Sequence, residues 1–358
     1  MQTFNWHLEL SSKCSLKCPR CSRTERPEKF IVTELNIDFI KSVFSYEILK
    51  NTKRVILCGG QGDPIYCKDF LKIVKYLKTN PNINLQIVTN GSYKTKDWWH
   101  ELSNILNEND DVVFSVDGWD QQSNDLYRVN NDFASILNGI NILAENKDVN
   151  IIWSTIVFRF NENELDKIKQ LAKQNGATHF QVVKSMMFGT HWPVYLNQEG
   201  IDPMEPVNVD SNVSKVLTSD RSNLVNLIDK DRKTNSIKHA VKQNYKKIEN
   251  KVADIIPSCM IGERSLYIDA EGILYPCSWI SHPFGTRQHK DKKITWNDSL
   301  FVKHKQDFNL HKHCLESILN NKRYKKLQET FFDKDNHFIE CLNKCPKKEV
   351  LKRIESIN

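Results

Sequence analysis

The chain has 358 residues, 39% hydrophobic and 27% charged, and its 51 Lys and Arg outnumber 44 Asp and Glu for a formal charge of +7. This composition excludes a wholly disordered chain and predicts a sizeable core, in two or three domains or in one large α/β unit with an appendage. No apolar stretch approaches the ~18 residues that span a bilayer, and the N-terminus lacks the order of a secretion signal, so we expect a cytoplasmic protein with no membrane contact.

The positive excess is small for this length. Lysines gather at 242–247 and 322–326. Such clusters are usually solvated faces, and contact with nucleic acid is the alternative.

Up to about residue 185, short apolar runs alternate with amphipathic stretches. Six runs predict strands, at 6–10, 54–58, 85–89, 112–116, 151–158 and 179–184. Helical patterns fill the intervals, at about 36–49, 67–79, 95–107, 132–146 and 162–175. Strands separated by helices indicate right-handed βαβ units and a parallel sheet, either open or partly closed into a barrel. In both arrangements, functional residues lie at the carboxyl ends of the strands.

The alternating pattern ends after residue 184. Prolines and polar residues follow at 190–220, and a charged, helical pattern at 221–256. We therefore predict an α/β domain over 1–187, a linker with bridging helices over 188–257, and a small C-terminal α+β domain over 258–358.

Ten cysteines are an unusual number for a chain without an export signal, in which disulfides explain them poorly. Eight of them cluster near the two ends, at Cys14, Cys18, Cys21, Cys259, Cys277, Cys314, Cys341 and Cys345. Clustered thiols in a reducing compartment indicate metal or iron–sulfur ligation. The other two, Cys58 and Cys67, are typical of buried small apolar residues.

Cys14, Cys18 and Cys21 form a Cys-x3-Cys-x2-Cys motif directly after the first predicted strand. Three thiolates on a short loop can hold three irons of a [4Fe–4S] cluster and leave the fourth iron open to a ligand. A zinc knuckle is the alternative, although it normally needs a fourth His or Cys nearby.

This motif resembles that of the radical S-adenosylmethionine (radical SAM) superfamily, over roughly residues 4–185. The resemblance implies a partial (β/α)6 TIM-type barrel, a [4Fe–4S] cluster on Cys14, Cys18 and Cys21, and S-adenosylmethionine (SAM) bound at the open iron. It also implies reductive cleavage of SAM to a 5′-deoxyadenosyl radical that abstracts hydrogen from a substrate.

A glycine-rich stretch after the second predicted strand contains Gly60, Gln61, Gly62 and Asp63. Glycines at a strand end let the backbone approach a ligand closely, and a carboxylate can receive an ammonium group. The stretch is similar to the Gly-Gly-Glu-Pro motif with which the superfamily binds the SAM amino group. Asp63 replaces the glutamate here and shortens the reach, and a plain strand-to-helix turn is the alternative.

Further SAM contacts are expected after the next strands. Asn90 ends the third strand, and Ser115 and Asp117 resemble the Ser-Val-Asp-Gly stretch of peptide-modifying relatives. Arg128 resembles the downstream arginine of those relatives and suits a carboxylate clamp, with a surface salt bridge as the alternative. Ser154 is a further candidate for contact with the ribose.

Cys259 and Cys277, with Gly272 between them, resemble the opening of the SPASM or shorter twitch domains that carry auxiliary [4Fe–4S] clusters. The intervening residues 265–276 predict a β-hairpin that turns at Ala-Glu-Gly. By this likeness Cys341 and Cys345 complete one auxiliary cluster, and Cys314 is a spare or an alternative ligand. A structural zinc ribbon would use the same four thiols.

The sequence therefore predicts a radical SAM enzyme, with two [4Fe–4S] clusters, that acts on a peptide or small-molecule substrate. The auxiliary cluster would accept an electron or anchor the substrate, and a flavodoxin- or ferredoxin-type donor would reduce the first cluster. Two alternatives remain, a radical SAM enzyme that modifies RNA and a zinc-binding interaction protein without catalysis. The sequence identifies no catalytic acid or base.

Overall fold

A computed structural model of the chain describes residues 4–25, 27–60, 62–183, 188, 195–207, 216–217, 264–281 and 303–330. The chain divides into two compact units. The first unit comprises Met1–Leu10, Thr33–Ile56 and Leu227–Asn358, and the second comprises Ser11–Val32 and Leu57–Asn226. The predicted domain boundaries at 187 and 257 fall outside the described residues and stay predictions.

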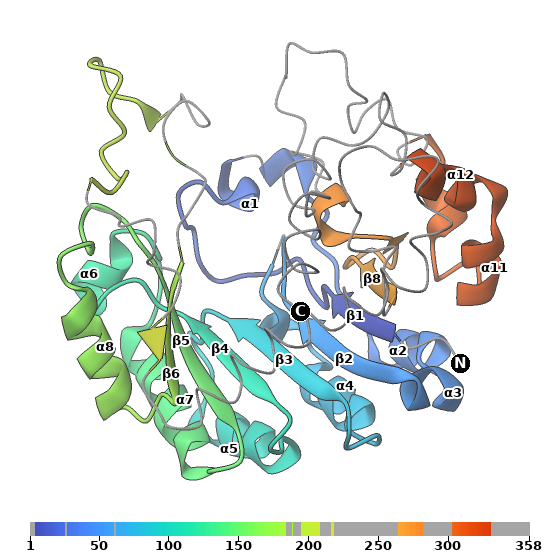
Figure 1. The fold of residues 1–358 in the computed structure, drawn as a ribbon, viewed down its shortest axis with the longest axis horizontal. Helices are drawn as coiled ribbons and strands as arrows, with labels where there is room; N and C mark the ends of the chain where they lie inside the picture. The colour runs from blue at the N-terminus through green and yellow to red at the C-terminus, as the bar shows by residue number, and fades with distance from the viewer. Residues whose placement is uncertain are drawn as a thin grey trace, which may run out of the picture. The chain divides into compact units, whose positions relative to one another are not determined.

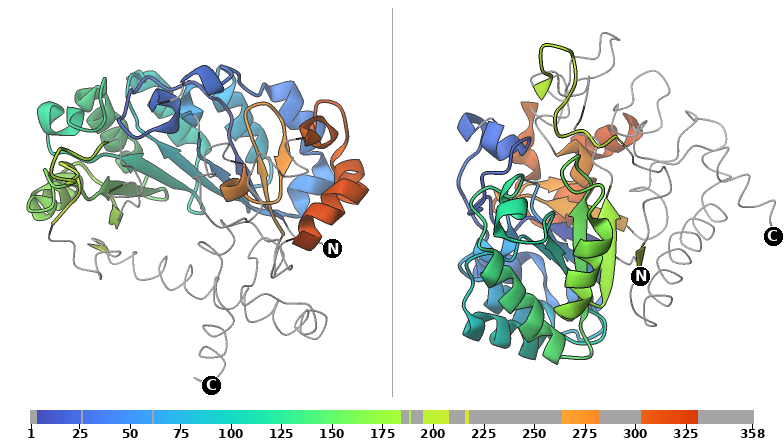
Figure 2. Two further views of the ribbon diagram at one scale, coloured as in Figure 1. Left: turned by 90° about the horizontal axis from the view of Figure 1, so that it is seen from above. Right: turned by 90° about the vertical axis from the view of Figure 1, so that its left-hand side faces the viewer.

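The second unit contains a run of parallel strands in chain order. They are β3 (Asn84–Thr89), β4 (Asp111–Ser115), β5 (Asn150–Ile156) and β6 (His179–Val183), with β7 (Val216–Leu217) antiparallel to β6. Its helices are α1 (Ser22–Glu25), α4 (Phe70–Leu77), α5 (Lys96–Ile105), α6 (Gln121–Asp125), α7 (Phe133–Glu145) and α8 (Leu165–Gln174). Figure 1 shows α5, α7 and α8 along one face of these strands, and Figure 2 shows α8 beside β6. The alternation is that of βαβ units.

Burial along β5 alternates residue by residue, as expected for a strand with one face against helices. Trp153 is completely buried, whereas its neighbours Ile152 and Ser154 are half-buried on the opposite face. Between the helices and the strands, the Trp99 ring of α5 packs against Phe114 of β4 with ring centroids 5.4 Å apart. The core of the second unit therefore lies on the helical side of the strands.

Local signals explain where several helices begin and end. The side chains of Asn36, Thr95 and Asp132 each accept a hydrogen bond from a backbone N–H three residues later, at the start of α2 (Ile37–Val43), α5 and α7. Gly176 has φ +85° directly after α8, a conformation that glycine adopts readily, so the predicted helix stop is confirmed.

The first unit contains four strands in the order β2-β1-β8-β9. They are β2 (Thr52–Leu57), β1 (Phe4–Leu8), β8 (Arg264–Ile268) and β9 (Leu274–Tyr275), and its helices are α2 (Ile37–Val43), α3 (Tyr46–Lys50), α11 (Leu315–Asn320) and α12 (Lys322–Thr330). Short 3-10 helices occur in both units, at Pro27–Lys29, Pro64–Tyr66, Ser278–Ile280 and Lys305–Phe308. β1 pairs in parallel with β8, and β8 pairs antiparallel with β9.

All six predicted strands are present, and their ends differ from the prediction by at most two residues. The hairpin at 265–276 is also confirmed, and Gly272 has φ +79° in its turn. The single helix predicted over 36–49 is wrong, because it is divided at the buried Phe44 and the N-cap position Ser45 into α2 and α3.

The chain has an α/β fold whose described strands are mostly parallel and do not close into a complete barrel. Among the described helices, none combines the length and apolar character needed to cross a membrane. The lysines of the 322–326 cluster are exposed on α12 while Tyr324 is buried, as a solvated helix face requires. The cluster at 242–247 lies outside the described residues.

Candidate functional site

The three N-terminal cysteines lie on one loop of the second unit, residues 11–21, which we call the cysteine loop. The N–H of Lys17 donates to the carbonyl oxygen of Val129 at 2.9 Å. The side-chain amide of Asn130 donates to the carbonyl oxygen of Ser15 at 2.8 Å. Since its backbone groups bond to the chain around Val129, the cysteine loop has a defined path over the ends of the parallel strands.

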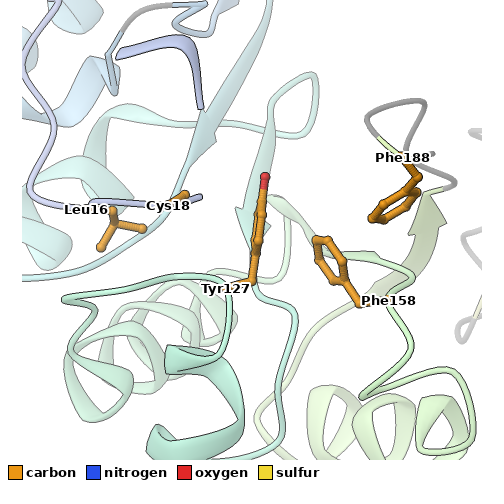
Figure 3. Packing of buried hydrophobic residues seen from close by; sticks show 5 residues of the cluster. All are labelled: Leu16, Cys18, Tyr127, Phe158 and Phe188. Carbon is orange, nitrogen blue, oxygen red and sulfur yellow. The ribbon is translucent and has the colours of Figure 1, made fainter. Parts of the chain in front are cut away.

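The thiols share one apolar environment. Cys18 is buried in a cluster that consists of Leu16, Cys18, Tyr127, Phe158 and Phe188, and Cys14 and Cys21 pack partly buried against it. Figure 3 shows the Tyr127 ring between Cys18 and Phe158, and the two ring centroids are 4.3 Å apart. We call these five residues the aromatic cluster. It shields one side of the thiols from water.

Burial and neighbouring charge both act on the thiols. Burial, followed by the negative charge of Asp63, raises the pKa of Cys14 to about 12. Burial also raises the pKa of Cys18, and the positive charge of Arg128 opposes that shift. At neutral pH these two thiols stay protonated unless a further positive charge, such as bound iron, stabilises the thiolates.

The glycine-rich stretch lies directly against the cysteine loop. The N–H of Asp63 donates to the carbonyl oxygen of Lys13 at 2.8 Å. A Cβ atom on Gly62 would lie 2.1 Å from the carbonyl oxygen of Ser11, a distance that no side chain tolerates. Glycine at position 62 therefore permits the close approach of two loops that are about 50 residues apart in the sequence.

Asp63 is a buried acceptor that connects this stretch to the end of β3. Its carboxylate accepts hydrogen bonds from the backbone N–H of Asn90 at 2.6 Å and from the hydroxyl of Thr89 at 2.9 Å. Burial raises the pKa of Asp63 to about 6. The Asn90 side-chain amide bonds to the same carboxylate and lies 3.6 Å from the Cys14 sulfur. Asp63 and Asn90 thus support the cysteine loop. A ligand ammonium group that bound Asp63 would share its carboxylate with the hydrogen-bond donors of Thr89 and Asn90.

Asp117 and Arg128 form a buried ion pair beside Cys18. Arg128 Nε lies 2.6 Å from an Asp117 carboxylate oxygen, with the two side chains 15% and 0% exposed. The other carboxylate oxygen accepts the N–H of Ile156 at the end of β5. The salt bridge considered from the sequence is therefore present, but it is largely shielded from solvent instead of lying on the surface. The positive charge of Arg128 also lowers the pKa of Cys18 against the effect of burial, so a permanent cation acts on a cluster-ligand candidate.

Ser115 and Ser154 are direct neighbours across β4 and β5. Both are half-buried and lie on the strand face opposite the fully buried Phe114 and Trp153. The ladder continues to the exposed Gln181 on β6, which pairs with Ser154. Three polar side chains thus line one row of the face away from the helices, near the carboxyl ends of the strands.

Comparison with protein-family models identifies the family to which this part of the chain belongs. Residues 8–174 match the family model described as Radical SAM superfamily. This part of the chain is a radical SAM domain. It is therefore the catalytic domain of an enzyme superfamily, and it implies a [4Fe–4S] cluster and SAM.

Solved structures show a similar fold. Native anSMEcpe with bound AdoMet and Kp18Cys peptide has 14% sequence identity and a TM-score of 0.50, and the match covers 99% of this chain and 98% of that chain. A polyhistidine-tagged anSMEcpe with bound AdoMet has the same identity and TM-score, with 90% of this chain and 79% of that chain covered. Streptococcus suis SuiB bound to S-adenosylmethionine is 11% identical with a TM-score of 0.49, over 95% and 77% of the two chains. A comparison with curated proteins gives no match.

The residues of the radical SAM domain fit an iron–sulfur cluster. Three thiols, without a histidine, occupy the cysteine loop. The Asn90 amide donates a hydrogen bond to the Cys14 sulfur, a kind of contact that tunes clusters, and the positive charge of Arg128 acts on Cys18. In the part of the chain that the structure describes, no three His, Cys, Asp or Glu side chains converge as ligands of a single metal ion. In a [4Fe–4S] cluster each of three thiolates binds a different iron, and the three thiols of the cysteine loop suit that role.

Several expected ligands cannot be placed. Gln61, Cys259, Cys341 and Cys345 lie outside the described residues. Cys277 is described and half-buried, two residues after β9 in the first unit. Cys314 is exposed at the N-cap position of α11. Gly60 is described and half-buried, two residues before Gly62.

Sequence reasoning missed residues that support the radical SAM domain without a motif of their own. Asn161 is completely buried, and its side-chain amide donates to the carbonyl oxygens of Asp117 and Ile156 at 2.8 and 2.9 Å. The hydroxyl of Tyr66 lies 2.6 Å from that of Ser15 on the cysteine loop. Asn161 follows the end of β5 by five residues and Tyr66 follows the end of β2 by nine, and neither position carries a signal in the local sequence.

Proposed function

We propose that the cysteine loop binds a [4Fe–4S] cluster through Cys14, Cys18 and Cys21, and that the enzyme cleaves SAM reductively and abstracts hydrogen from a substrate. The observation that carries this proposal is the packing of all three thiols around one aromatic cluster within a radical SAM domain. When bound, the cluster supplies one electron to SAM, which divides into methionine and a 5′-deoxyadenosyl radical.

The SAM contacts proposed from the sequence are Gly60, Gln61, Gly62, Asp63, Asn90, Ser115, Asp117, Arg128 and Ser154. The described members of this set belong to the second unit, and their surroundings suit them to different tasks. Ser115 and Ser154 present hydroxyls on the open strand face and suit contact with a ribose. Arg128 has further guanidinium donors beyond the Nε that bonds to Asp117, and these suit a carboxylate.

Three other members, Gly62, Asp63 and Asn90, contact or support the cysteine loop. Gly62 permits contact with Ser11, and Asp63 connects the loop to Asn90. Because these residues bond within the chain, we expect their substitution to reduce cluster content as well as SAM binding.

A peptide is the substrate class that we favour. Support comes from anSMEcpe, which shares the fold over 99% of this chain and is recorded with a bound peptide. A small molecule is the other outcome of a substrate screen. The electron would come from a flavodoxin- or ferredoxin-type donor, as the chemistry of SAM cleavage requires an external reductant.

An auxiliary [4Fe–4S] cluster in a twitch- or SPASM-like domain would use Cys277 with Cys259, Cys341 and Cys345. Its support is the sequence pattern and the confirmed hairpin that leads to Cys277. This cluster would accept an electron from the substrate radical or anchor the substrate. We infer a cytoplasmic location from the many free thiols, which persist in a reducing compartment.

The test is anaerobic iron and sulfide analysis combined with an assay for 5′-deoxyadenosine after dithionite reduction. We expect about eight irons per chain, about four each in the Cys18→Ala and Cys277→Ala variants, and no 5′-deoxyadenosine from Cys18→Ala. Cys58→Ala serves as the matched control and should keep both iron and activity. Zinc without iron, together with intact SAM, would refute the proposal and favour a binding protein.

A further inference from the structure

The cysteine loop contains a buried arginine between two of its thiols. Arg20 is 1% exposed, although a charged arginine is almost never fully buried unless it is paired. Its φ angle is +64°, in the left-handed region that side chains other than glycine rarely adopt. A residue in this conformation persists only where its surroundings fix it strongly.

The surroundings of Arg20 provide such fixation. Its two terminal guanidinium nitrogens lie 2.6 Å from the two carboxylate oxygens of Asp202, in a bidentate pair. The Asp202 side chain has no exposed surface. The rings of Tyr195 and Phe188 lie 4.1 and 5.2 Å from the guanidinium carbon, so the cation is also stabilised by aromatic faces.

The segment 195–204, which we call the clasp, holds the cysteine loop at a second point. The backbone N–H of Arg20 donates to the hydroxyl oxygen of Tyr195 at 3.0 Å, and that hydroxyl donates to the carboxylate of Glu25 in α1. The same side chain therefore connects the cysteine loop to the helix that follows it.

The clasp is itself attached to the second unit. The N–H of Met204 donates to Asp202 at 3.0 Å, and its carbonyl oxygen accepts the N–H of Arg159 at 3.0 Å. The Met204 side chain packs against the aromatic cluster that surrounds Cys18. The position of Asp202 is thus fixed by contacts other than its ion pair with Arg20.

Arg20 is two residues after Cys18 and one residue before Cys21, so whatever fixes Arg20 also fixes the path between those thiols. We infer that the Arg20–Asp202 pair is a positioning device, which holds Cys18 and Cys21 at the spacing required for the cluster and protects Cys18 from solvent. The cluster part of this inference rests on the proposed function. The thiol-positioning part concerns the apoprotein alone.

The test compares Asp202→Asn with Asp110→Asn. Asp110 forms a buried ion pair with Lys78, at 2.9 Å and with side chains 0% and 5% exposed, so the control removes the same charge from a similar pair in the same unit. The first readout is the rate at which iodoacetamide alkylates Cys18 and Cys21 in the apoprotein, measured by peptide mass spectrometry. Cys67, buried at 4% exposure elsewhere in the unit, reports general opening of the fold.

We expect Asp202→Asn to raise the alkylation rate of Cys18 at least tenfold while that of Cys67 stays unchanged. In the reconstituted protein, the half-life of bound iron under a chelator should fall at least tenfold. Asp110→Asn should lower the thermal midpoint without either effect. Arg20→Lys, which keeps the charge but loses the bidentate geometry, should show the same changes in weaker form and replaces Asp202→Asn if that variant does not fold.

Equal alkylation rates in wild type and in Asp202→Asn would overturn the inference. So would an equal increase in Asp110→Asn, because the effect would then follow from general destabilisation. A third outcome would distinguish the proposed function from the positioning role of the Arg20–Asp202 pair. If the wild type takes up no iron but Asp202→Asn still exposes Cys18, the proposed function fails and the positioning of the thiols stands.

Discussion

Replacement of Gly62 by alanine tests whether the close approach of two loops creates the functional site. The substitution adds one methyl group at a position where φ is not in the left-handed region, so the backbone conformation itself suits alanine. The methyl carbon would lie 2.1 Å from the carbonyl oxygen of Ser11 and 2.7 Å from the Cα atom of Ser12. Both neighbours are backbone atoms and cannot rotate away as a flexible side chain could.

The size of the displacement follows from these distances. Real Cβ atoms essentially never come within 3.0 Å of such neighbours, so the two loops must separate by about 0.9 Å. Overpacking of this kind costs about 1–3 kcal/mol of stability. Misplacement of a reacting group by about 1 Å can lower a rate roughly 100-fold. We therefore expect 5′-deoxyadenosine formation to fall about 100-fold, with less iron retained on the cysteine loop.

The matched control is Gly200→Ala. A Cβ atom on Gly200 would meet nothing within 4 Å, but its φ of +74° makes alanine unfavourable by about 1–2 kcal/mol. Both variants should thus lose stability, measured by chemical denaturation of the apoprotein. Only Gly62→Ala should lose iron and 5′-deoxyadenosine formation. Normal iron content and activity in Gly62→Ala would refute the reasoning, because the contact with Ser11 would then have no functional consequence.

Two further predictions concern stability. Burial raises the pKa of Asp269 to about 6 from an ordinary 3.8, so between these pH values the folded state binds more protons than the unfolded state. The free energy of unfolding should therefore fall by about 3 kcal/mol as the pH rises through this window, and then level off. In Asp269→Asn this pH-dependent change in stability should be absent. If the free energy of unfolding, measured from pH 4 to pH 7, changes by the same amount in wild type and variant, the prediction is wrong. Gly139→Ala in α7 places a Cβ atom 2.6 Å from the buried Trp99 ring, so overpacking of about 1–3 kcal/mol should outweigh the gain in helix propensity of about 1 kcal/mol and lower the denaturation midpoint. A midpoint at or above that of the wild type would show that Trp99 can move aside.

The sequence alone predicted the six strands along the chain, since strands of this kind depend on local signals. Alternating apolar residues predict β5, and Gly176 predicts the end of α8, because hydrophobic periodicity and helix caps act over a few residues. The motif formed by Cys14, Cys18 and Cys21 is likewise contained in one short stretch of the sequence. The division of the helix at Phe44 was not predictable in this way, because the burial of that ring depends on distant residues.

What only the tertiary structure decided is how distant residues support these thiols. Arg20 and Asp202 are 182 residues apart, and nothing in either local sequence marks them as partners. Asp63 is similar, since the sequence shows a carboxylate after a strand but not that Thr89 and Asn90 donate to it. Pairings of this kind depend on which strand ends lie side by side and on how fully water is excluded between them. The sequence carried the cysteine motif of the radical SAM domain, and the fold determined which distant residues contact the cysteine loop.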